Sequence, residues 1–498
     1  MAQESDNRGD LDRTTGGLAV MSGHLVRADS DQIGEIRAQF PELARKVRDG
    51  QPLVYLDSAA TTLRPLALVQ AMEDFAFHHN AAVHRGAHQL AEEATEAFEN
   101  ARATVARFLN ADPGEVVWTS GATGGLNLIA HAIGELSSYA KLQRLKQGEI
   151  AGQARNDGVG QARNDGVGEA RNDGQRNSKL ALAPGDEIVV SVAEHHSNLV
   201  PWQQLAARTG AVLKWFDVTD EGRIDLSSLD ELITERTKIV ALTHVSNVTG
   251  AITPVAPIVV RAKQVGAVTV LDACQSAAHL PLDVRQLGVD FLVFSGHKVF
   301  GPTGVGVLYG RREILAQLPP VNFGGSMVKK VTMTTATFLD PPMRFEAGTQ
   351  MVTEAIGLAA ALDWLSSAVE QGAQRPTVET QNSVIELVET TSYEADLTRE
   401  LLKIQEIPGI TIVGPTDLKD RTALVSFTVD GVHPHDVGQV LDDAGVAVRV
   451  GQHCAQPIHA RFGMHSTVRA SASIYNTVAE IEKFRAALAT VRPFFGVA

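Results

Sequence analysis

Five short apolar runs in this sequence each end abruptly in polar residues, and this pattern limits the fold more than any other feature. The runs with their polar ends span residues 115–125, 187–196, 238–247, 267–275 and 289–298. Each has the length and the β-branched content of a buried strand. In open α/β sheets the carboxyl ends of parallel strands meet at the edge where ligands bind. We therefore expect the polar groups to line one crevice.

Two of these strand ends carry a lysine and a carboxylate with complementary chemistry. Lys298 follows the run 289–294, and Asp272 ends the run 267–271. A lysine at a strand mouth can bond an aldehyde cofactor as a Schiff base, and pyridoxal 5'-phosphate (PLP) is the commonest such partner. A carboxylate beside a protonated pyridine nitrogen keeps the PLP ring an electron sink. Either residue alone is more often structural, but five converging strand ends favour a cofactor site.

A glycine-rich turn precedes a helix at the first of these strand ends. The sequence Thr119-Ser-Gly-Ala-Thr-Gly-Gly leads into the amphipathic segment 126–133. Glycines let backbone N–H groups approach an anion, the helix dipole favours negative charge, and Thr123 can add a hydroxyl group. The turn matches neither the dinucleotide pattern G-x-G-x-x-G nor the nucleotide pattern G-x-x-x-x-G-K-S/T, which disfavours dehydrogenases and nucleotide hydrolases. It predicts a phosphate site of another kind.

On these residues and the motifs given below, the sequence resembles the PLP-dependent fold type I enzymes of the class V aminotransferase group, and within that group the SufS-type cysteine desulfurases. The resemblance extends from about Phe40 to the C-terminus. Several motifs are shared with related lyases and epimerases, but Arg449-Val-Gly-Gln-His-Cys narrows the resemblance to sulfur transfer. The shared motifs are residues 54–60, 82–86, 194–198, 243–247, 295–298, 301–304, 344–349 and 449–454.

The resemblance implies a cysteine desulfurase that converts L-cysteine to L-alanine and transfers the sulfur to an enzyme cysteine as a persulfide, supplying iron-sulfur cluster assembly. It assigns Lys298 as the cofactor lysine and the base at the substrate α-carbon, and Asp272 as the partner of the pyridine nitrogen. It places His195 on the ring, where it assists proton transfer, and Gln275 at the ring oxygen. The residues assigned to the phosphate are Thr123, Ser295, His297 and, from a partner subunit, Thr349.

The resemblance also assigns the substrate contacts and the partners. Asn247 and Arg469 correspond to the pair that fixes the substrate carboxylate, and arginine is suited to a bidentate grip. A threonine that crosses to the partner's phosphate implies a homodimer with shared sites. The expected partners are therefore L-cysteine, a second copy of the chain and a sulfur-acceptor protein. The residues expected to line the entrance are Arg449, His84 and Arg85.

The chain contains two cysteines, Cys274 and Cys454. This number excludes a disulfide framework, argues against a metal cluster and fits a reduced, cytoplasmic setting. Cys454 lies in a polar, turn-rich segment beside His453 and near Arg449, where positive charge would favour the thiolate and nucleophilic attack. Cys274 lies where the family uses small residues, and we expect it to serve packing.

One residue departs from the family pattern. The family often carries two histidines before the catalytic cysteine, and here the first is Gln452. An uncharged amide removes a possible proton donor and cation, so the degree of thiol activation stays open. Two alternatives also stay open: another PLP enzyme of this fold, such as a selenocysteine lyase, an epimerase or an aminotransferase, and a catalytically silent scaffold protein. A nucleophilic Cys454 would distinguish a desulfurase from another PLP enzyme of this fold. Bound PLP would distinguish it from a catalytically silent scaffold protein.

Composition fits a large soluble protein. The 498 residues are 44% hydrophobic, enough for a large core, and we expect no apolar stretch long enough to span a bilayer. Lys and Arg number 44 against 58 Asp and Glu, and the net charge of -14 disfavours nucleic acid as a partner. The N-terminus lacks the basic start and apolar core of a secretory signal, and we expect it to be a disordered leader.

Two segments break the family's spacing and are expected to be insertions. Residues 141–179 contain the octet Gln153-Ala-Arg-Asn-Asp-Gly-Val-Gly, a second copy from Gln161 and a shortened copy from Glu169. Such a repeat has no apolar face to bury, so it predicts a disordered surface loop, and its carboxylates are too sparse for a calcium site. The second insertion, 374–391, mixes Pro, Thr and Gln, and its function is unreadable.

Strands that alternate with amphipathic helices predict an α/β protein with a large, mostly parallel-sheet domain and a smaller α+β domain. The resemblance implies that this fold is PLP-dependent fold type I. We expect a disordered leader at 1–30 and an N-terminal helix at 31–54 that joins the small domain. The large PLP-binding domain is expected at 55–341 and the small C-terminal domain at 342–498.

Overall fold

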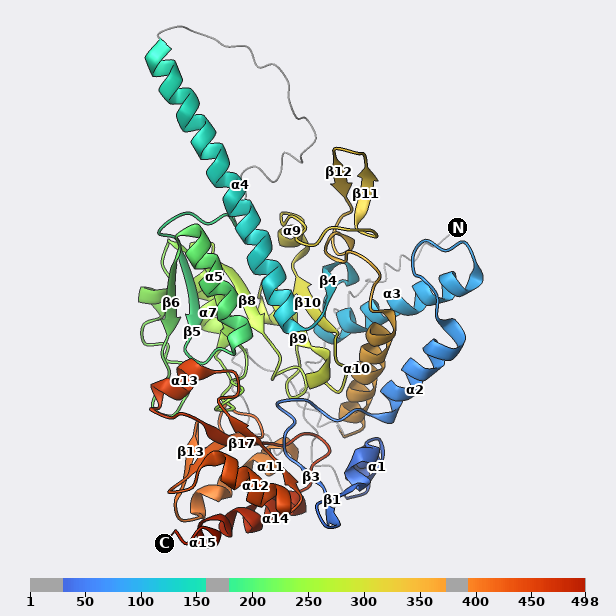
Figure 1. Cartoon of the computed structure of the whole chain (residues 1–498), viewed down its shortest axis with the longest axis vertical. Coiled ribbons are helices and arrows are strands. Elements are labelled where there is room, and N and C mark those ends of the chain that lie inside the picture. The colour runs from blue at the N-terminus through green and yellow to red at the C-terminus, as the bar shows by residue number, and fades with distance from the viewer. Residues whose placement is uncertain (1–29, 158–178, 373–392, 498) are drawn as a thin grey trace, which may run out of the picture.

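The computed structural model describes residues 30–157, 179–372 and 393–497 of the chain. Its larger part is built on a seven-stranded sheet in the order β4-β10-β9-β8-β7-β5-β6 (Figure 1). Strands β9, β8, β7, β5 and β6 are parallel neighbours, and β10 is antiparallel to both β4 and β9. The strands are β4 (Val116–Thr119), β5 (Glu187–Ser191), β6 (Val212–Phe216), β7 (Thr237–Thr243), β8 (Val268–Asp272), β9 (Phe291–Ser295) and β10 (Gly306–Gly310).

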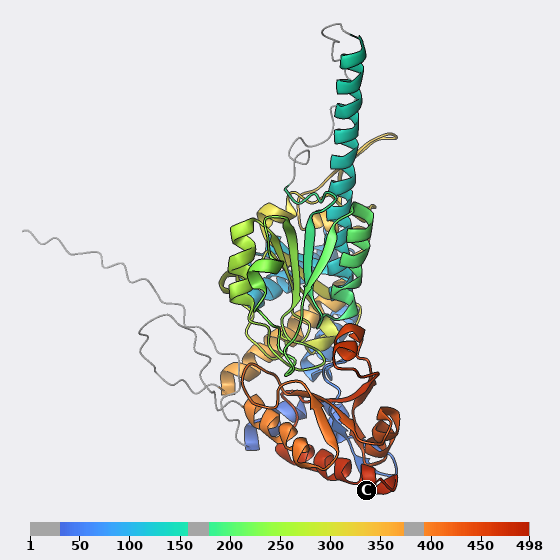
Figure 2. The ribbon, with the colours of Figure 1, turned by 90° about the vertical axis from the view of Figure 1, so that its left-hand side faces the viewer.

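Helices cover both faces of this sheet (Figure 2). Successive residues of a strand point to opposite faces. Phe291 and Val293 of β9 share a core with α4 (Ala122–Asp157) and α5 (Val200–Thr209). Leu292 and Phe294 share the other core with α3 (Gln89–Leu109), α7 (Val255–Val265) and α10 (Val352–Gly372). Burial on both faces explains why the strand runs are continuously apolar rather than alternating.

Shorter elements complete the large domain around this three-layer core. The hairpin β11–β12 extends from the layer that contains α9 (Figure 1). The elements are α2 (Leu66–Asp74), α6 (Leu229–Leu232), α8 (Val284–Leu287), α9 (Arg312–Leu315), β11 (Val328–Val331) and β12 (Ala336–Phe338).

The C-terminal part is a separate α+β layer, drawn in orange and red in Figure 1. Its four strands form an antiparallel sheet in the order β13-β14-β17-β16. The strands are β13 (Ile410–Val413), β14 (Leu424–Val429), β16 (Arg449–Gly451) and β17 (Thr467–Ser471). The helices are α11 (Tyr393–Leu402), α12 (Pro434–Asp443), α13 (Gln456–Arg461), α14 (Val478–Ala489) and α15 (Val491–Phe494).

The N-terminal segment lies against this smaller layer. Arg37 of α1 (Ser30–Ala38) pairs with Glu480 of α14 at 2.8 Å. After the short hairpin of β1 (Lys46–Val47) and β2 (Gln51–Pro52), β3 (Val54–Tyr55) pairs in parallel with β15 (Val446–Ala447). The chain therefore begins its described part in the small domain before it enters the large one.

Helix α4 differs from the sequence-based expectation at its C-terminal end. The expected disordered loop starts at residue 141, but α4 continues to Asp157 and projects from the body of the molecule (Figure 2). Residues 141–157 are rich in Lys, Leu, Gln, Arg, Glu and Ala, which have high helix propensity, so the helix that starts at the glycine-rich turn is extended rather than ended. The rest of the repeat segment, 158–178, lies outside the described residues.

Helix α10 also corrects the expected position of the domain boundary. The sequence-based boundary at 341/342 assigns this helix to the small domain, yet α10 packs against α2 and α3 of the large domain. A Cβ atom added at Gly357 would lie 2.7 Å from the side chain of Met72, so glycine allows α10 and α2 to pack closely here. Helix α10 therefore packs with the large domain, and near its C-terminal end Leu365 and Val369 also line a pocket with Tyr393 and Leu397 of α11. The expected insertion at 374–391 lies outside the described residues.

The same helix corrects the expectation about apolar length. Its window Val352–Val369 is long and apolar enough to cross a membrane, with a mean hydropathy of 1.3, and 44% of that window is buried. Its contacts with α2 and α3 are those of a core helix.

Candidate active site

The carboxyl ends of four adjacent parallel strands carry the polar residues that the sequence singles out. Asp272 is the last residue of β8, and Lys298 ends the short helix η6 (Gly296–Lys298) that directly follows β9. His195 and Asn247 follow β5 and β7 within four residues. Because these strands are parallel neighbours, the four residues lie at one edge of the sheet. The backbone contact between His196 and the segment after β16 places that edge toward the small domain (Figure 2).

The turn that carries Lys298 is fixed by the segment after β3. The carbonyl oxygen of His297 accepts hydrogen bonds from the hydroxyl groups of Thr61 at 3.1 Å and Thr62 at 3.2 Å, and from the Thr62 N–H at 2.9 Å. Lys298 itself is half-buried. Burial and the nearby Lys298 lower the pKa of His297 to about 4, so its imidazole is neutral at neutral pH.

Asp272 is a buried carboxylate at the end of β8. Its side chain is 4% exposed, and Oδ1 accepts the backbone N–H of Cys274 at 3.0 Å. Among the described residues, no lysine, arginine or histidine forms a salt bridge with it. A buried charge is costly unless it is paired, so this site fits a cationic group bound beside Asp272.

His195 has a defined tautomer. It precedes the short helix η5 (His196–Asn198), and its Nδ1 accepts the backbone N–H of Ser197 at 3.1 Å. The proton of the neutral ring therefore lies on Nε2. Burial lowers the pKa of His195 to about 4, with a further contribution from Lys298. The neutral ring offers one N–H donor and an apolar face at the strand edge.

The carboxyl group of Glu194 fixes the backbone beside His195. It is fully buried and accepts hydrogen bonds from the Ser191 hydroxyl at 2.5 Å, the Asn198 amide at 2.6 Å and the Thr243 N–H at 3.0 Å. Burial raises the pKa of Glu194 to about 8. These bonds join the ends of β5 and β7. The sequence analysis missed this role, although the strand-end position of Glu194 signalled it.

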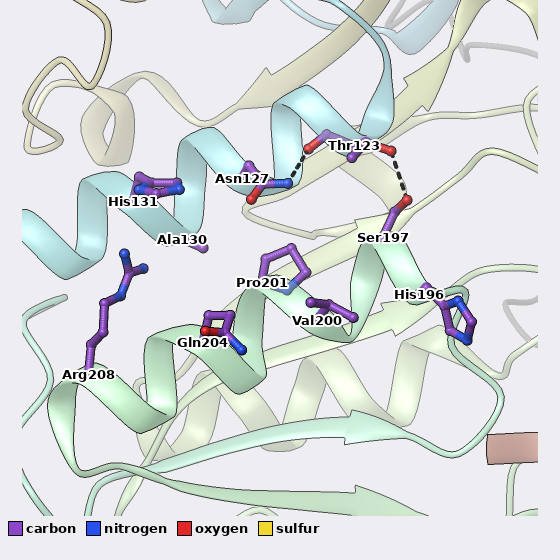
Figure 3. Close-up of a pocket in the computed structure, with 10 residues that line it drawn as sticks. All are labelled: Thr123, Asn127, Ala130, His131, His196, Ser197, Val200, Pro201, Gln204 and Arg208. Atoms are coloured by element: carbon purple, nitrogen blue, oxygen red, sulfur yellow. Dashed lines mark hydrogen bonds between the residues drawn. The ribbon is translucent and has the colours of Figure 1, made fainter. Parts of the chain in front are cut away.

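The N-terminus of α4 lies beside the carboxyl end of β9. The hydroxyl oxygen of Ser295 accepts the Ala122 N–H at 2.9 Å, and the hydroxyl groups of Thr123 and Ser197 lie 2.7 Å apart (Figure 3). A cavity of about 460 Å³ continues from these hydroxyl groups along the groove between α4 and α5. Gly124 and Gly125 lack side chains in the first turn of the helix, where added Cβ atoms would meet Ser120 at 2.7 Å and Val293 at 3.0 Å. The exposed hydroxyl group of Thr123 at a helix N-terminus suits a phosphate.

Cys454 reaches this edge from the small domain. It lies between β16 and α13, and its side chain is exposed. The large domain holds its backbone, because the His196 N–H donates to the Cys454 carbonyl oxygen and the Asn247 amide donates to the His453 carbonyl oxygen, both at 2.7 Å. The backbone of Cys454 therefore lies beside the turn that contains His195.

Asp57 holds the two arginines expected at the substrate site. Its carboxylate lies 2.8 Å from Arg449 Nη2 and 3.6 Å from Arg469 Nη2. Arg469 also donates to the Asn247 carbonyl oxygen at 2.9 Å, and its buried Nε has no hydrogen-bond partner among the described residues. Burial lowers the pKa of Arg469 to about 10. Asp57 was not predicted, although it ends the apolar run 53–56 in the same way as Asp272 ends its own.

A chain of hydrogen bonds fixes the ring of His453. His459 Nδ1 donates to the Ala455 carbonyl oxygen at 2.9 Å, so its Nε2 accepts from the Thr467 hydroxyl at 3.2 Å. The Thr467 oxygen then accepts from His453 Nε2 at 2.9 Å. His453 Nδ1 is left as a buried acceptor without a partner among the described residues. Burial and the nearby Arg469 lower the pKa of His453 to about 2, so this ring adds no positive charge to the thiol.

Cys274 and Gln275, two and three residues after Asp272, are held close to the carboxyl end of β8. Gln275 is buried, and its amide donates to the Ala59 carbonyl oxygen at 2.8 Å. The sulfur of Cys274 lies 3.8 Å from the Ser295 hydroxyl, and burial raises the pKa of this thiol to about 12. Cys274 therefore stays protonated at neutral pH.

Three expected residues lie apart from these groups within one chain. Thr349 is exposed in the loop after η7 (Met343–Phe345), and Arg85 is exposed before α3. His84 Nε2 lies 2.9 Å from Glu99 Oε1 of α3. Among the contacts of the described residues, none joins these three to the strand ends.

The chain matches a known protein family and is similar to several known proteins. The family model Aminotransferase class-V matches residues 54–142 and 165–484. The chain is 45% identical over 93% of its length to the probable cysteine desulfurase 2 of Mycobacterium leprae, of which it covers 97%. It is 44% identical over 93% of its length to the probable cysteine desulfurase of Streptomyces coelicolor, of which it covers 97%.

Two solved structures share the fold over nearly the whole chain. The cysteine desulfurase of Thermococcus onnurineus matches with a TM-score of 0.75 and 34% identity, covering 92% of this chain and 97% of its own. The cysteine desulfurase CsdA of Escherichia coli matches with a TM-score of 0.72 and 35% identity, covering 93% of this chain and 98% of its own. The chain belongs to the class V aminotransferase family and, within it, to the cysteine desulfurases.

Proposed function

We propose that the protein is a PLP-dependent desulfurase that breaks the carbon–sulfur bond of L-cysteine and keeps the sulfur on Cys454. The thiolate of Cys454 forms a sulfur–sulfur bond with the substrate sulfur, and the carbon–sulfur bond breaks. Its electron pair stays on the substrate carbon, which takes up a proton and leaves as alanine. The products, alanine and a persulfide, balance the reaction without an added oxidant or reductant.

The residues at the sheet edge fit PLP, which when bound supplies an electron sink for negative charge at the substrate α-carbon. Asp272, a buried carboxylate that forms no salt bridge within the described part of the chain, would pair with the protonated ring nitrogen. Lys298 would bond the aldehyde carbon and later take the α-proton. His195 would lie against the ring. The residues proposed for the ring oxygen and the phosphate are Gln275, Thr123, Ser295, His297 and the partner's Thr349.

The substrate carboxylate would bind Arg469. Its guanidinium is held by Asp57 and by the Asn247 carbonyl oxygen, while Nε is buried without a partner among the described residues. A carboxylate that accepts from Nε and a neighbouring N–H would satisfy this donor in the bidentate geometry that arginine favours. Asn247 would add its amide group, and Arg449 would line the entrance.

The observation that carries the proposal is the position of Cys454. Its thiol is exposed, and His196 and Asn247 bind the Cys454 segment beside the strand ends that hold His195 and Asp272. This arrangement supports a nucleophile from the small domain acting at the candidate cofactor site of the large domain. A PLP enzyme that does not transfer sulfur needs no thiol there.

Two variants test the assignment in pure protein supplied with L-cysteine and a thiol reductant. Lys298→Ala should lose the visible absorbance of bound PLP. Cys454→Ser should keep that absorbance and still bind L-cysteine, but form no persulfide and release sulfide far more slowly. Cys274→Ser is the matched control and should behave as the parent does. Sulfide release at the parental rate by Cys454→Ser would show that another group is the nucleophile.

We further propose an obligate homodimer in which Thr349 completes the phosphate site of the partner subunit. Its exposed position, away from the strand ends of its own chain, supports this arrangement. In mixed dimers of a Thr349→Ala subunit and a Lys298→Ala subunit, the site that retains its lysine takes threonine from the other chain and should have parental activity. Activity no higher than that of one Thr349→Ala site would contradict sharing, and an active monomer in light scattering would contradict the dimer.

The exposed thiol also supports transfer of the sulfur to an acceptor protein, which we propose belongs to iron-sulfur cluster assembly in the cytoplasm. Depletion of the protein from its host should lower the activities of iron-sulfur enzymes and leave enzymes without such clusters unchanged. Equal losses in both groups would argue against this destination for the sulfur.

A further inference from the structure

The segment that carries Cys454 has a backbone that must be held in place. His453 and Cys454 are consecutive residues in the left-handed region, with φ of 50° and 55°. Residues with a side chain adopt this conformation at a cost and keep it where surrounding contacts determine it. The segment follows β16 of the small domain, and contacts from both domains hold it: His453 Nε2 donates to Thr467 of β17, while His196 and Asn247 of the large domain donate to the carbonyl oxygens of Cys454 and His453.

His196 makes two of these contacts, one on each side of Ala455. Its backbone N–H donates to the Cys454 carbonyl oxygen at 2.7 Å, and its Nε2 accepts the backbone N–H of Gln456 at 3.1 Å. Ala455 between them is fully buried. Because Nε2 accepts, the neutral ring carries its proton on Nδ1. Figure 3 shows His196 at the end of the α4–α5 groove, with its ring directed away from α4.

Gln452 extends the same arrangement within the small domain. Its side-chain oxygen accepts from the Gln456 amide group at 2.7 Å, and its backbone oxygen accepts the Ala455 N–H at 2.9 Å. Gln456 thus binds Gln452 with its side chain and His196 with its backbone. The residue that departs from the family pattern therefore supports the segment that His196 holds.

We infer that His196 is a positioning residue for the nucleophile, because it clamps residues 454–456 of the small domain onto the turn that contains His195. The clamp sets the distance between the Cys454 thiol and a substrate bound at the large-domain edge. This inference rests on the proposed role of Cys454. It assigns His196 no contact with substrate or cofactor.

Three variants of the holoenzyme separate positioning from general stability. His196→Leu removes the side-chain acceptor and keeps the backbone N–H. His196→Gln restores an amide oxygen near the position of Nε2. His435→Leu changes an exposed histidine on α12 whose ring stacks on His433, and it serves as the matched control.

Hydrogen exchange of the peptide 452–458 measures the clamp directly, without any turnover. Exchange should be about tenfold faster in His196→Leu, which corresponds to about 1.4 kcal/mol, and close to the parental rate in His196→Gln and His435→Leu. Unchanged exchange in His196→Leu would show that the side chain does not hold the segment.

Single-turnover formation of the Cys454 persulfide, counted per bound PLP, measures the positioning. His196→Leu should lower the rate constant for persulfide formation roughly tenfold to a hundredfold, because a small misplacement of a reacting group has effects of that size. The L-cysteine concentration that gives half the maximal rate should be nearly unchanged. His196→Gln should recover most of the loss. Fast exchange with a parental persulfide rate would overturn the positioning role. A parent protein that forms no persulfide would overturn the proposed function, while the exchange rates would still decide the clamp.

Discussion

A buried ion pair ties the loop that carries Thr349 to the core. Arg102 of α3 donates to both carboxylate oxygens of Glu346, at 2.7 and 3.0 Å, and the two side chains are 2% and 3% exposed. The backbone N–H of Trp118 donates to the same carboxylate at 2.8 Å. Glu346 lies three residues before Thr349, so the pair also sets where that threonine is presented.

Arg102→Met should lower the free energy of unfolding by about 3–5 kcal/mol, because it leaves the Glu346 carboxylate buried without a cation. The double variant Arg102→Met/Glu346→Leu removes both charges and leaves the Trp118 N–H without its acceptor, which costs about 1–3 kcal/mol. The double variant should therefore be more stable than the single one. On the same helix, Arg107 pairs with Asp363 at 67% and 56% exposure, and Arg107→Met should cost less than about 1 kcal/mol.

Urea unfolding followed by tryptophan fluorescence measures these differences, with the slope against denaturant compared among variants. Trp118 lies next to Arg102, so the probe reports on the region that is changed. Equal losses for Arg102→Met and Arg107→Met would refute the reasoning from burial. A double variant less stable than Arg102→Met would refute the assignment of the loss to an unpaired charge.

Three further predictions use groups at or near the site. Burial lowers the pKa of His244 from 6.5 to about 4. As the pH falls below 6.5, this histidine therefore takes up a proton in the unfolded chain before it does so in the folded protein. The free energy of unfolding is unaffected by this group above pH 6.5 and falls by about 3 kcal/mol in total toward pH 4. The urea midpoint of His244→Asn should accordingly fall less between pH 7 and pH 4.5 than that of the parent, and equal falls would contradict this. Iodoacetamide at pH 7.5 should label Cys454 and spare Cys274, whose thiol stays protonated, as mass spectrometry would show; label on Cys274 would contradict the burial argument. Thr467→Val breaks the hydrogen-bond chain to His453 and should lower turnover roughly tenfold or more, while Thr467→Ser keeps it; equal losses in both would rule out the hydroxyl group as the cause.

Much of the fold and part of the site follow from local sequence. A buried parallel strand needs a continuous apolar run, so the runs before Asp272 and Lys298 became β8 and β9, and the α/β class and its parallel edge were predictable. The same rule would have identified Asp57 and Glu194, which also stand at the ends of apolar runs. The length of α4 was not read correctly, because the repeats from Gln153 onward obscured the helix-forming residues before them.

Other features depend on contacts between distant parts of the chain. Asp57 and Arg449 are separated by 392 residues and His196 and Gln456 by 260, and no local pattern specifies either pairing. The boundary after α10 was decided by its packing on α2 and α3 rather than by its own composition. The sequence by itself determined which strands form and which polar residues end them, because strand formation depends on local burial patterns. The tertiary structure decided how the Cys454 segment is held, because the carbonyl oxygens of its two left-handed residues accept hydrogen bonds from His196 and Asn247, which reach them once the two domains pack together.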